Sequence, residues 1–137
     1  MTQPELATIS VEKYFPHPPR KVWRGLTDPA LLAKWWAAGN IAPTVGHKFE
    51  LDMQNWGMVP CKVLEVRPEE FISFTFNETW TLSWRLLAEG EGTRLYLEQS
   101  GLDLSKPMDR FAYENMQKGW ASEVLPRLGE LLDEVPD

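Results

Sequence analysis

The longest hydrophobic pattern in the chain lies in its last part, at positions 103–135. Apolar side chains recur there at intervals of three and four, which places them on one face of a helix. These side chains are Ala112, Met116, Trp120, Val124, Leu128, Leu131, Leu132 and Val135. The pattern predicts one long helix whose apolar face must be covered by the rest of the domain.

Local signals refine this helix. Ser105 is expected to cap its start, and Pro107 and Asp109 suit its first turn. Gly119 indicates a close backbone approach or a bend, because glycine weakens a helix interior by roughly 1 kcal/mol relative to alanine. Pro126 removes a backbone hydrogen bond and predicts a kink near Ser122.

The N-terminal part predicts a strand followed by two short helices. Apolar and polar residues alternate over 7–15, as in a strand with one buried face. Prolines then end the strand, and a helix is predicted over 19–26. Asp28 is a good N-cap and Pro29 a good first residue for a second helix that ends near Trp36, before a loop at 37–46.

The middle of the chain predicts strands joined by turns. In the segment 80–86, Trp80, Leu82 and Trp84 should face the long helix while Arg85 faces water. A turn is expected at Asn55-Trp56-Gly57. The strands are predicted at 48–53, 58–67, 71–76, 80–86 and 94–99. The fold class is therefore α+β: one domain over residues 1–137, with about six curved antiparallel strands around a long C-terminal helix and two short helices after the first strand.

Composition narrows the functional classes. Seven Trp are present, an unusual number, and the formal net charge of −6 argues against nucleic acid as a partner. Cys61 has no second cysteine to pair with, which fits a reducing compartment. Neither a targeting signal nor an apolar run long enough to span a membrane is apparent, so we expect a cytoplasmic protein. We also expect a monomer or a weak dimer.

Candidate catalytic and metal-ligating residues are few. His17 and His47 could join Cys61 around a metal, but their spacing matches no known site, and His17 is expected to be exposed. Cys61 is predicted to be a small buried residue. No phosphate loop or zinc-hydrolase motif is present, so we predict no metal, no cofactor and no catalytic residue. The charged strand residues are expected to pair across the solvent face of the sheet: Glu50, Asp52, Arg85 and Glu98.

Several short motifs, taken together and in order, resemble a known family. They are Phe15, Pro18, Val22-Trp23, Leu26-Thr27-Asp28-Pro29, Trp35-Trp36, Gly92-Thr93-Arg94-Leu95, Ser100-Gly101 and Gly119-Trp120. The chain resembles the START-like helix-grip superfamily, and more narrowly the bacterial branch named for the activator of the heat-shock protein 90 ATPase. The resemblance covers nearly the whole chain. Relatives of this branch often carry His where this chain has Gln99.

The resemblance implies a hydrophobic cavity between the sheet and the long helix. Bulky residues that could line it, together with a few polar ones that could orient a ligand, form the predicted site. This set is Trp23, Trp35, Phe49, Met53, Met58, Cys61, Phe74, Trp80, Trp84, Leu97, Gln99, Tyr113, Met116 and Trp120, with Thr75 as a further polar candidate. No Lys or Arg is expected on the inner face, so charged ligands should bind poorly.

Three functions stay open at this point. The first is a non-enzymatic binder of a small hydrophobic molecule, lipid-like or aromatic. The second is a stress-related, co-chaperone-like module that binds a chaperone. The third is an enzyme such as a cyclase or a hydratase, because one fold can support unrelated functions.

Overall fold

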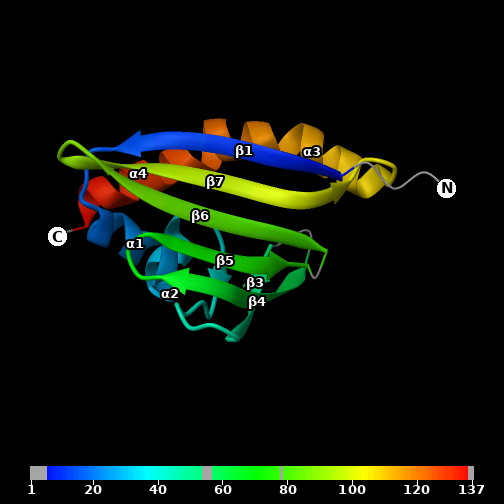
Figure 1. The fold of residues 1–137 in the computed structure, drawn as a ribbon, viewed down its shortest axis with the longest axis horizontal. Coiled ribbons are helices and arrows are strands. Elements are labelled where there is room, and N and C mark those ends of the chain that lie inside the picture. The colour runs from blue at the N-terminus through cyan, green and yellow to red at the C-terminus, as the bar shows by residue number, and fades with distance from the viewer. Residues whose placement is uncertain (1–5, 54–56, 78, 136–137) are drawn as a thin grey trace.

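The computed structural model describes residues 6–53, 57–77 and 79–135, so the predicted turn at Asn55-Trp56-Gly57 lies largely outside the described residues. The chain forms a curved antiparallel sheet with a long C-terminal helix along one face (Figure 1). The strands are β1 (Leu6–Phe15), β2 (Ala38–Gly39), β3 (Lys48–Asp52), β4 (Met58–Arg67), β5 (Phe71–Phe76), β6 (Trp80–Glu89) and β7 (Gly92–Asp103). The helices are α1 (Pro19–Thr27), α2 (Pro29–Trp35), α3 (Pro107–Gly119), the π-helical turn η2 (Trp120–Val124) and α4 (Leu125–Glu134). The predicted fold class is confirmed.

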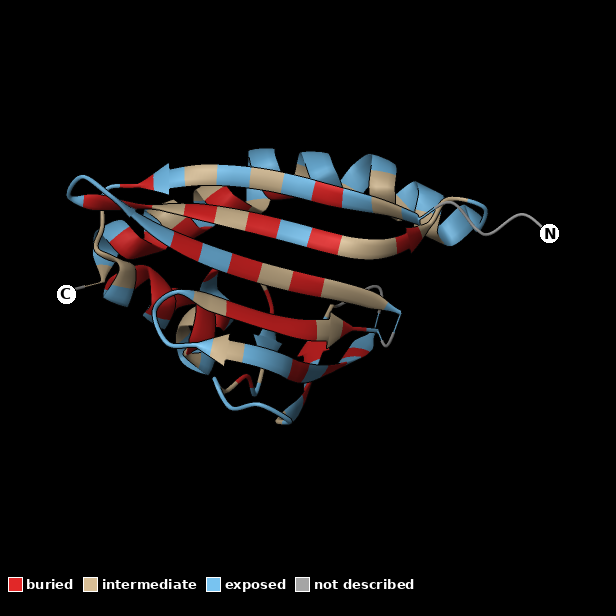
Figure 2. Cartoon of the chain, in the orientation of Figure 1, coloured by how far each residue is buried: buried red, intermediate tan, exposed pale blue. Residues whose placement is uncertain are grey.

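The sheet runs in the order β1-β7-β6-β5-β4-β3-β2, and every neighbouring pair is antiparallel. All six predicted strands are present. The described residues add a seventh, β2, inside the predicted loop, because two residues are too few to show an alternating pattern. Buried and exposed residues alternate along the strands (Figure 2). Leu82 and Trp84 are buried while Arg85 is exposed, as predicted.

The two short helices are fixed by local hydrogen bonds. The Asp28 carboxylate accepts the backbone N–H of Ala30 at 2.9 Å, which confirms the predicted N-cap of α2. The indole N–H of Trp35 donates to the backbone carbonyl of Gly25 at 2.7 Å and so ties α2 to α1. Val22 and Leu26 of α1 are fully buried. The pair of helices therefore forms a rigid cover over one end of the sheet.

The long helix changes its geometry in the middle. At its centre the N–H of Leu125 donates to the carbonyl of Trp120, five residues earlier, which defines a π turn. The turn directly precedes Pro126, whose ring would clash in a regular α-helix with the carbonyl of Ser122. The expected kink therefore takes the form of a π turn. Because this turn contains an extra residue, Leu125 rather than Val124 follows Trp120 on the buried face.

The start of α3 differs from the prediction. Ser105 does not cap the helix: the N-cap position is Lys106, which makes no side-chain cap hydrogen bond. Ser105 instead donates its hydroxyl and its N–H to the carboxylate of Asp103, at 2.6 and 3.0 Å. These bonds hold the pKa of Asp103 below its ordinary value. Pro107 and Asp109 lie in the first turn as predicted, and Asp109 accepts the N–H of Asp103 at 2.8 Å.

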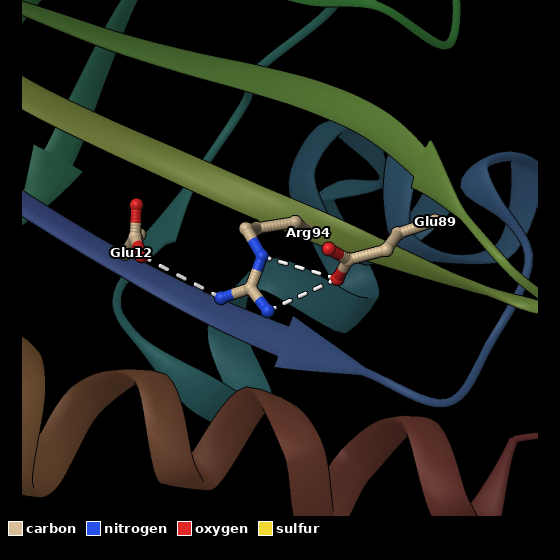
Figure 3. Close-up of polar contacts among 3 residues, drawn as sticks. All are labelled: Glu12, Glu89 and Arg94. Atoms are coloured by element: carbon tan, nitrogen blue, oxygen red, sulfur yellow. Dashed lines mark hydrogen bonds and ion pairs between the residues drawn. The ribbon is translucent and has the colours of Figure 1, made fainter.

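The convex face of the sheet is polar and faces solvent. Arg94 on β7 lies between Glu12 of β1 and Glu89 of β6, at 3.6 and 3.0 Å (Figure 3). The hydrogen bond to Glu89 raises the pKa of Arg94. The charged residues expected on this face are all exposed: Glu50, Asp52, Arg85 and Glu98. These charged groups lie on the outer face, apart from the concave side.

Candidate functional site

The two halves of the long helix pack differently. Helix α4 contacts α1 and α2 and buries four leucines: Leu125, Leu128, Leu131 and Leu132. Helix α3 contacts β1 and β7 and contains no buried residue, as the colouring of Figure 2 shows. The short helices cover only one end of the sheet, and among the described residues neither of them lines the space beneath α3. The interior is therefore tightly packed beneath α4 and less completely filled beneath α3.

A pocket of about 500 Å³ occupies the space beneath α3. Its wall combines one face of α3 with the ends of β4, β5 and β6 and with Trp36 and Met53. The lining residues are Trp36, Met53, Met58, Val59, Phe76, Asn77, Trp80, Met108, Asp109, Phe111, Ala112, Asn115, Met116, Gly119, Trp120 and Val124. All four methionines of the described chain are among them. Thioethers and aromatic rings form an apolar, deformable wall.

One buried side-chain amide forms hydrogen bonds to two residues that line the pocket. Gln99 on β7 is 1% exposed, and its Oε1 accepts the indole N–H of Trp120 at 3.2 Å. Its Nε2 donates to the sulfur of Met116 at 3.5 Å. Gln99 does not line the pocket itself, but both of its partners do. The amide therefore fixes the orientation of two wall residues on the helix.

An aromatic cluster forms part of the wall, with Trp36 at its centre. The ring of Trp36 lies 5.1 Å from Trp120, 5.7 Å from Trp84 and 6.0 Å from Phe76, measured between centroids. Phe76 stacks in turn on Trp80 at 5.8 Å. Such pairs stabilise a particular geometry beyond simple burial. The aromatic part of the wall is therefore preformed.

The structure divides the predicted site residues into two groups. Five line the pocket: Met53, Met58, Trp80, Met116 and Trp120. Most of the others are core residues with no more than 8% exposure: Trp23, Trp35, Phe49, Cys61, Phe74, Trp84, Leu97 and Gln99. Tyr113 is partly buried and packs against the core. Thr75 accepts the N–H of Lys62 at 3.0 Å and lies outside the pocket lining.

Sequence reasoning missed eleven lining residues, and one signal could have found several of them. The helical stripe could have been extended by one turn and widened, because four further residues follow the same spacing of three and four. These are Met108, Phe111, Asn115 and Gly119. Asp109, Ala112 and Val124 also lie on the long helix, and Ala112 and Val124 already belong to the predicted stripe. The other four come from strand ends and loops, where sequence spacing says little about proximity: Trp36, Val59, Phe76 and Asn77.

A second hollow lies at the edge formed by β2 and β3. It is a wide depression of about 540 Å³ lined by Ala38, Gly39, Asn40, Lys48, Phe49, Glu50, Asp52 and Met58. Most of these residues are exposed. An enclosed apolar wall can bury far more of a small molecule than an open polar depression. We therefore take the pocket beneath α3 as the candidate site.

The histidines do not form a metal centre. The Nε2 of His17 lies 2.8 Å from the carboxylate of Asp133 on α4, and its side chain is only 13% exposed, which corrects the predicted exposure. His47 is hydrogen bonded to the carbonyl of Asn40 and stacks on Phe49. Within the described ranges, no group of three or more His, Cys, Asp or Glu side chains could hold a metal ion.

Cys61 is expected to be chemically inert in the folded protein. Its side chain is buried, as predicted, and desolvation raises the pKa of the thiol to about 12. A thiol reacts through its thiolate, which is scarce at neutral pH for such a group. A thiol-specific reagent should leave the native protein unmodified at pH near 8 and label one thiol per chain after unfolding in urea. Rapid stoichiometric labelling of the native protein would contradict this.

The comparisons now identify the family. The family model for activator of Hsp90 ATPase homolog 1-like proteins matches residues 16–133. The chain belongs to this family. The fold and its relatives also place it among START-like helix-grip proteins, as the sequence motifs suggested. No curated protein matches the chain.

Solved structures of several bacterial proteins share the fold. Protein MLL2253 from Mesorhizobium loti is 33% identical, with a TM-score of 0.85 over 96% of this chain and 100% of its own. Protein BH1534 from Bacillus halodurans is 26% identical, with a TM-score of 0.83 over 95% and 99%. DynU16, a putative protein of the dynemicin biosynthetic locus, is 23% identical with a TM-score of 0.77, over 92% of this chain and 47% of that one. In the described part of the chain, no helix is long and apolar enough to cross a membrane.

Most family motifs of this chain support the fold and not the pocket. The buried Thr93 hydroxyl donates to the carbonyl of His17 at 2.8 Å, and a side chain at Gly92 would collide with the carbonyl of Phe15. Gly101 has a φ of +87° and lies against the carbonyl of Thr79, so a larger residue would be strained there. Among the motif residues, Trp36, Gly119 and Trp120 line the pocket.

Gly119 is expected to be replaceable by alanine with a gain in stability. It has helical backbone angles, and a Cβ placed on it would meet no atom within 4 Å, so the predicted close approach is absent. Gly119→Ala should raise the free energy of unfolding by about 0.5–1 kcal/mol, because alanine loses less backbone entropy. Gly129→Ala is the control: its Cβ would lie 3.4 Å from the Phe15 ring, so a smaller gain is expected. Urea unfolding measures both, and a destabilised Gly119→Ala would contradict the open space.

Proposed function

We propose that the protein binds a small, mostly apolar molecule, lipid-like or aromatic, in the pocket beneath α3. The observation that carries this proposal is the composition of the wall, where four methionines surround the rings of Trp36, Phe76, Trp80 and Trp120. A volume of about 500 Å³ lies within the range of small-molecule sites in proteins. Methionine adapts to varied shapes, so related ligands should be accepted.

The mouth of the pocket supports entry from solution. Met58, Met108 and Phe111 are 56%, 63% and 55% exposed, and they are among the most exposed large apolar residues of the described chain. Exposed apolar groups gathered at one site usually mark an interaction surface. Burial of this rim by a ligand would remove apolar surface from water on both partners.

Titration with a neutral fluorophore, N-phenylnaphthylamine, tests the proposal. We expect binding of about micromolar affinity, equivalent to about 8 kcal/mol, with energy transfer from tryptophan to the probe. Native mass spectrometry of the purified protein should also show a bound molecule or a one-to-one complex with added probe. If a diverse panel of neutral aromatic compounds changes neither tryptophan emission nor melting temperature, the proposal fails.

The exposed rim also favours a second candidate, a module that binds a chaperone, as the family description suggests. In this case Met108 and Phe111 would contact the partner directly. Phe111→Ser should then abolish stimulation of a heat-shock protein 90 ATPase by this protein. Absence of any stimulation by the unmodified protein would remove this candidate. Among the described lining residues only Asp109 is titratable, so no specific observation favours an enzymatic function.

A further inference from the structure

We propose that the pocket beneath α3 selects cationic amphiphiles, molecules with an apolar body and an ammonium or quaternary ammonium head. This inference rests on the proposed ligand-binding function and specifies the chemical class of the ligand. It follows from the polar groups of the wall, from its rings, and from the absence of Lys, Arg and His among its described residues. The earlier expectation that charged ligands bind poorly was based on the lack of Lys and Arg, an argument that applies to anions.

The described part of the wall carries one full charge, and this charge is negative. Among the described lining residues, Asp109 carries a carboxylate and no Lys, Arg or His is present. Its Oδ2 accepts the N–H of Asp103 at 2.8 Å, which fixes the carboxylate at the start of α3. The amino end of α3 contributes an opposite partial charge, about half of an elementary charge, so the carboxylate dominates the local field.

The hydrogen-bond donors of the described wall are neutral. The indole N–H of Trp120 is donated to Gln99, and that of Trp80 is buried and has no hydrogen-bond partner among the residues that the structure describes. The Nδ2 of Asn115 donates one of its two N–H groups to the carbonyl of Phe111 at 2.7 Å, and its amide oxygen is an acceptor. A carboxylate or sulfate head would therefore be desolvated without a positively charged partner among the described lining residues.

The rings of the wall favour a cation. An ammonium group over the face of an aromatic ring is attracted by the ring quadrupole, most strongly for Trp. Trp36, Trp80 and Trp120 line the same pocket as Asp109. Arg110, which follows Asp109 in the chain, is exposed and pairs with Glu114 at 3.5 Å on the surface of α3. The formal net charge of −6 adds a long-range attraction of the same sign.

Three probes with the same phenylbutyl body and different ends test the inference by isothermal titration calorimetry. The ends are trimethylammonium, the isosteric but neutral tert-butyl group, and carboxylate. We expect the trimethylammonium probe to bind about threefold to thirtyfold more tightly than the tert-butyl probe. The carboxylate probe should bind most weakly. Equal affinity for the first two probes, or preference for the carboxylate, would overturn the inference.

Asp109→Asn and Glu114→Gln are the matched variants, because each removes one negative charge from α3 and only the first lies in the wall. Asp109→Asn should weaken binding of the trimethylammonium probe about threefold to tenfold and leave the tert-butyl probe within twofold. Glu114→Gln should leave both unchanged. A parallel loss for both probes in Asp109→Asn would refute charge selection. If no probe binds the unmodified protein, the proposed function itself fails.

Discussion

Trp120→Ala is expected to lower the free energy of unfolding by roughly 3–5 kcal/mol, the range for removal of a large buried aromatic side chain. Trp120 is 2% exposed and lies between α3, which lines the pocket, and α4, which packs in the core. Its ring lies 5.1 Å from that of Trp36, so its loss would also loosen the aromatic cluster. The variant further leaves the buried Oε1 of Gln99 without its donor.

Urea unfolding followed by far-ultraviolet circular dichroism measures this loss. Trp120→Phe separates the two contributions, because it keeps an aromatic ring and removes the N–H that Gln99 accepts; we expect a loss of about 1–3 kcal/mol. Met108→Ala, on the exposed rim, should change stability by less than about 0.5 kcal/mol. A loss below about 1 kcal/mol for Trp120→Ala would show that this residue does not join the helix to the sheet.

Gly119→Phe is expected to weaken binding of the neutral tert-butyl probe more than tenfold, at least 1.4 kcal/mol. Gly119 lines the pocket, and the space in front of its Cβ is empty, so the new ring can occupy volume that the ligand needs. The same space means that the ring causes little clash, so the variant should remain folded. Phenylalanine introduces no additional tryptophan signal.

Two comparisons make this result specific. Gly119→Ala adds a single methyl group and should change the affinity less than threefold, so a loss confined to Gly119→Phe reports occupied volume. Leu97→Trp provides the contrast: Leu97 is fully buried in the packed core, so a larger residue there should cause strain of about 1–3 kcal/mol. Unchanged affinity in a folded Gly119→Phe protein would mean that the ligand binds elsewhere.

The candidate site was only partly predictable, and α3 shows why. The stripe from Ala112 to Val135 predicted one long helix whose apolar face is covered by the rest of the domain. Periodicity identifies an apolar face and says nothing about what lies opposite that face. In the structure the same stripe packs against α1 and α2 in its second half and lines a pocket in its first. Trp35 and Trp36 are a second example. The predicted site contained Trp35, but in the structure Trp36 lines the pocket and Trp35 lies in the core.

The sequence by itself determined the order of the elements, the buried face of each strand and the N-cap at Asp28, because these depend on neighbours a few residues away along the chain. Its motifs also indicated the family, and in the structure Thr93 donates to the carbonyl of His17 while Gly101 adopts a positive φ. Only the tertiary structure decided which part of the interior is packed and which part forms a pocket. That depends on how far α1 and α2 extend over the sheet, on the π turn that brings Leu125 onto the buried face after Trp120, and on contacts such as Gln99 with Trp120, between residues 21 positions apart.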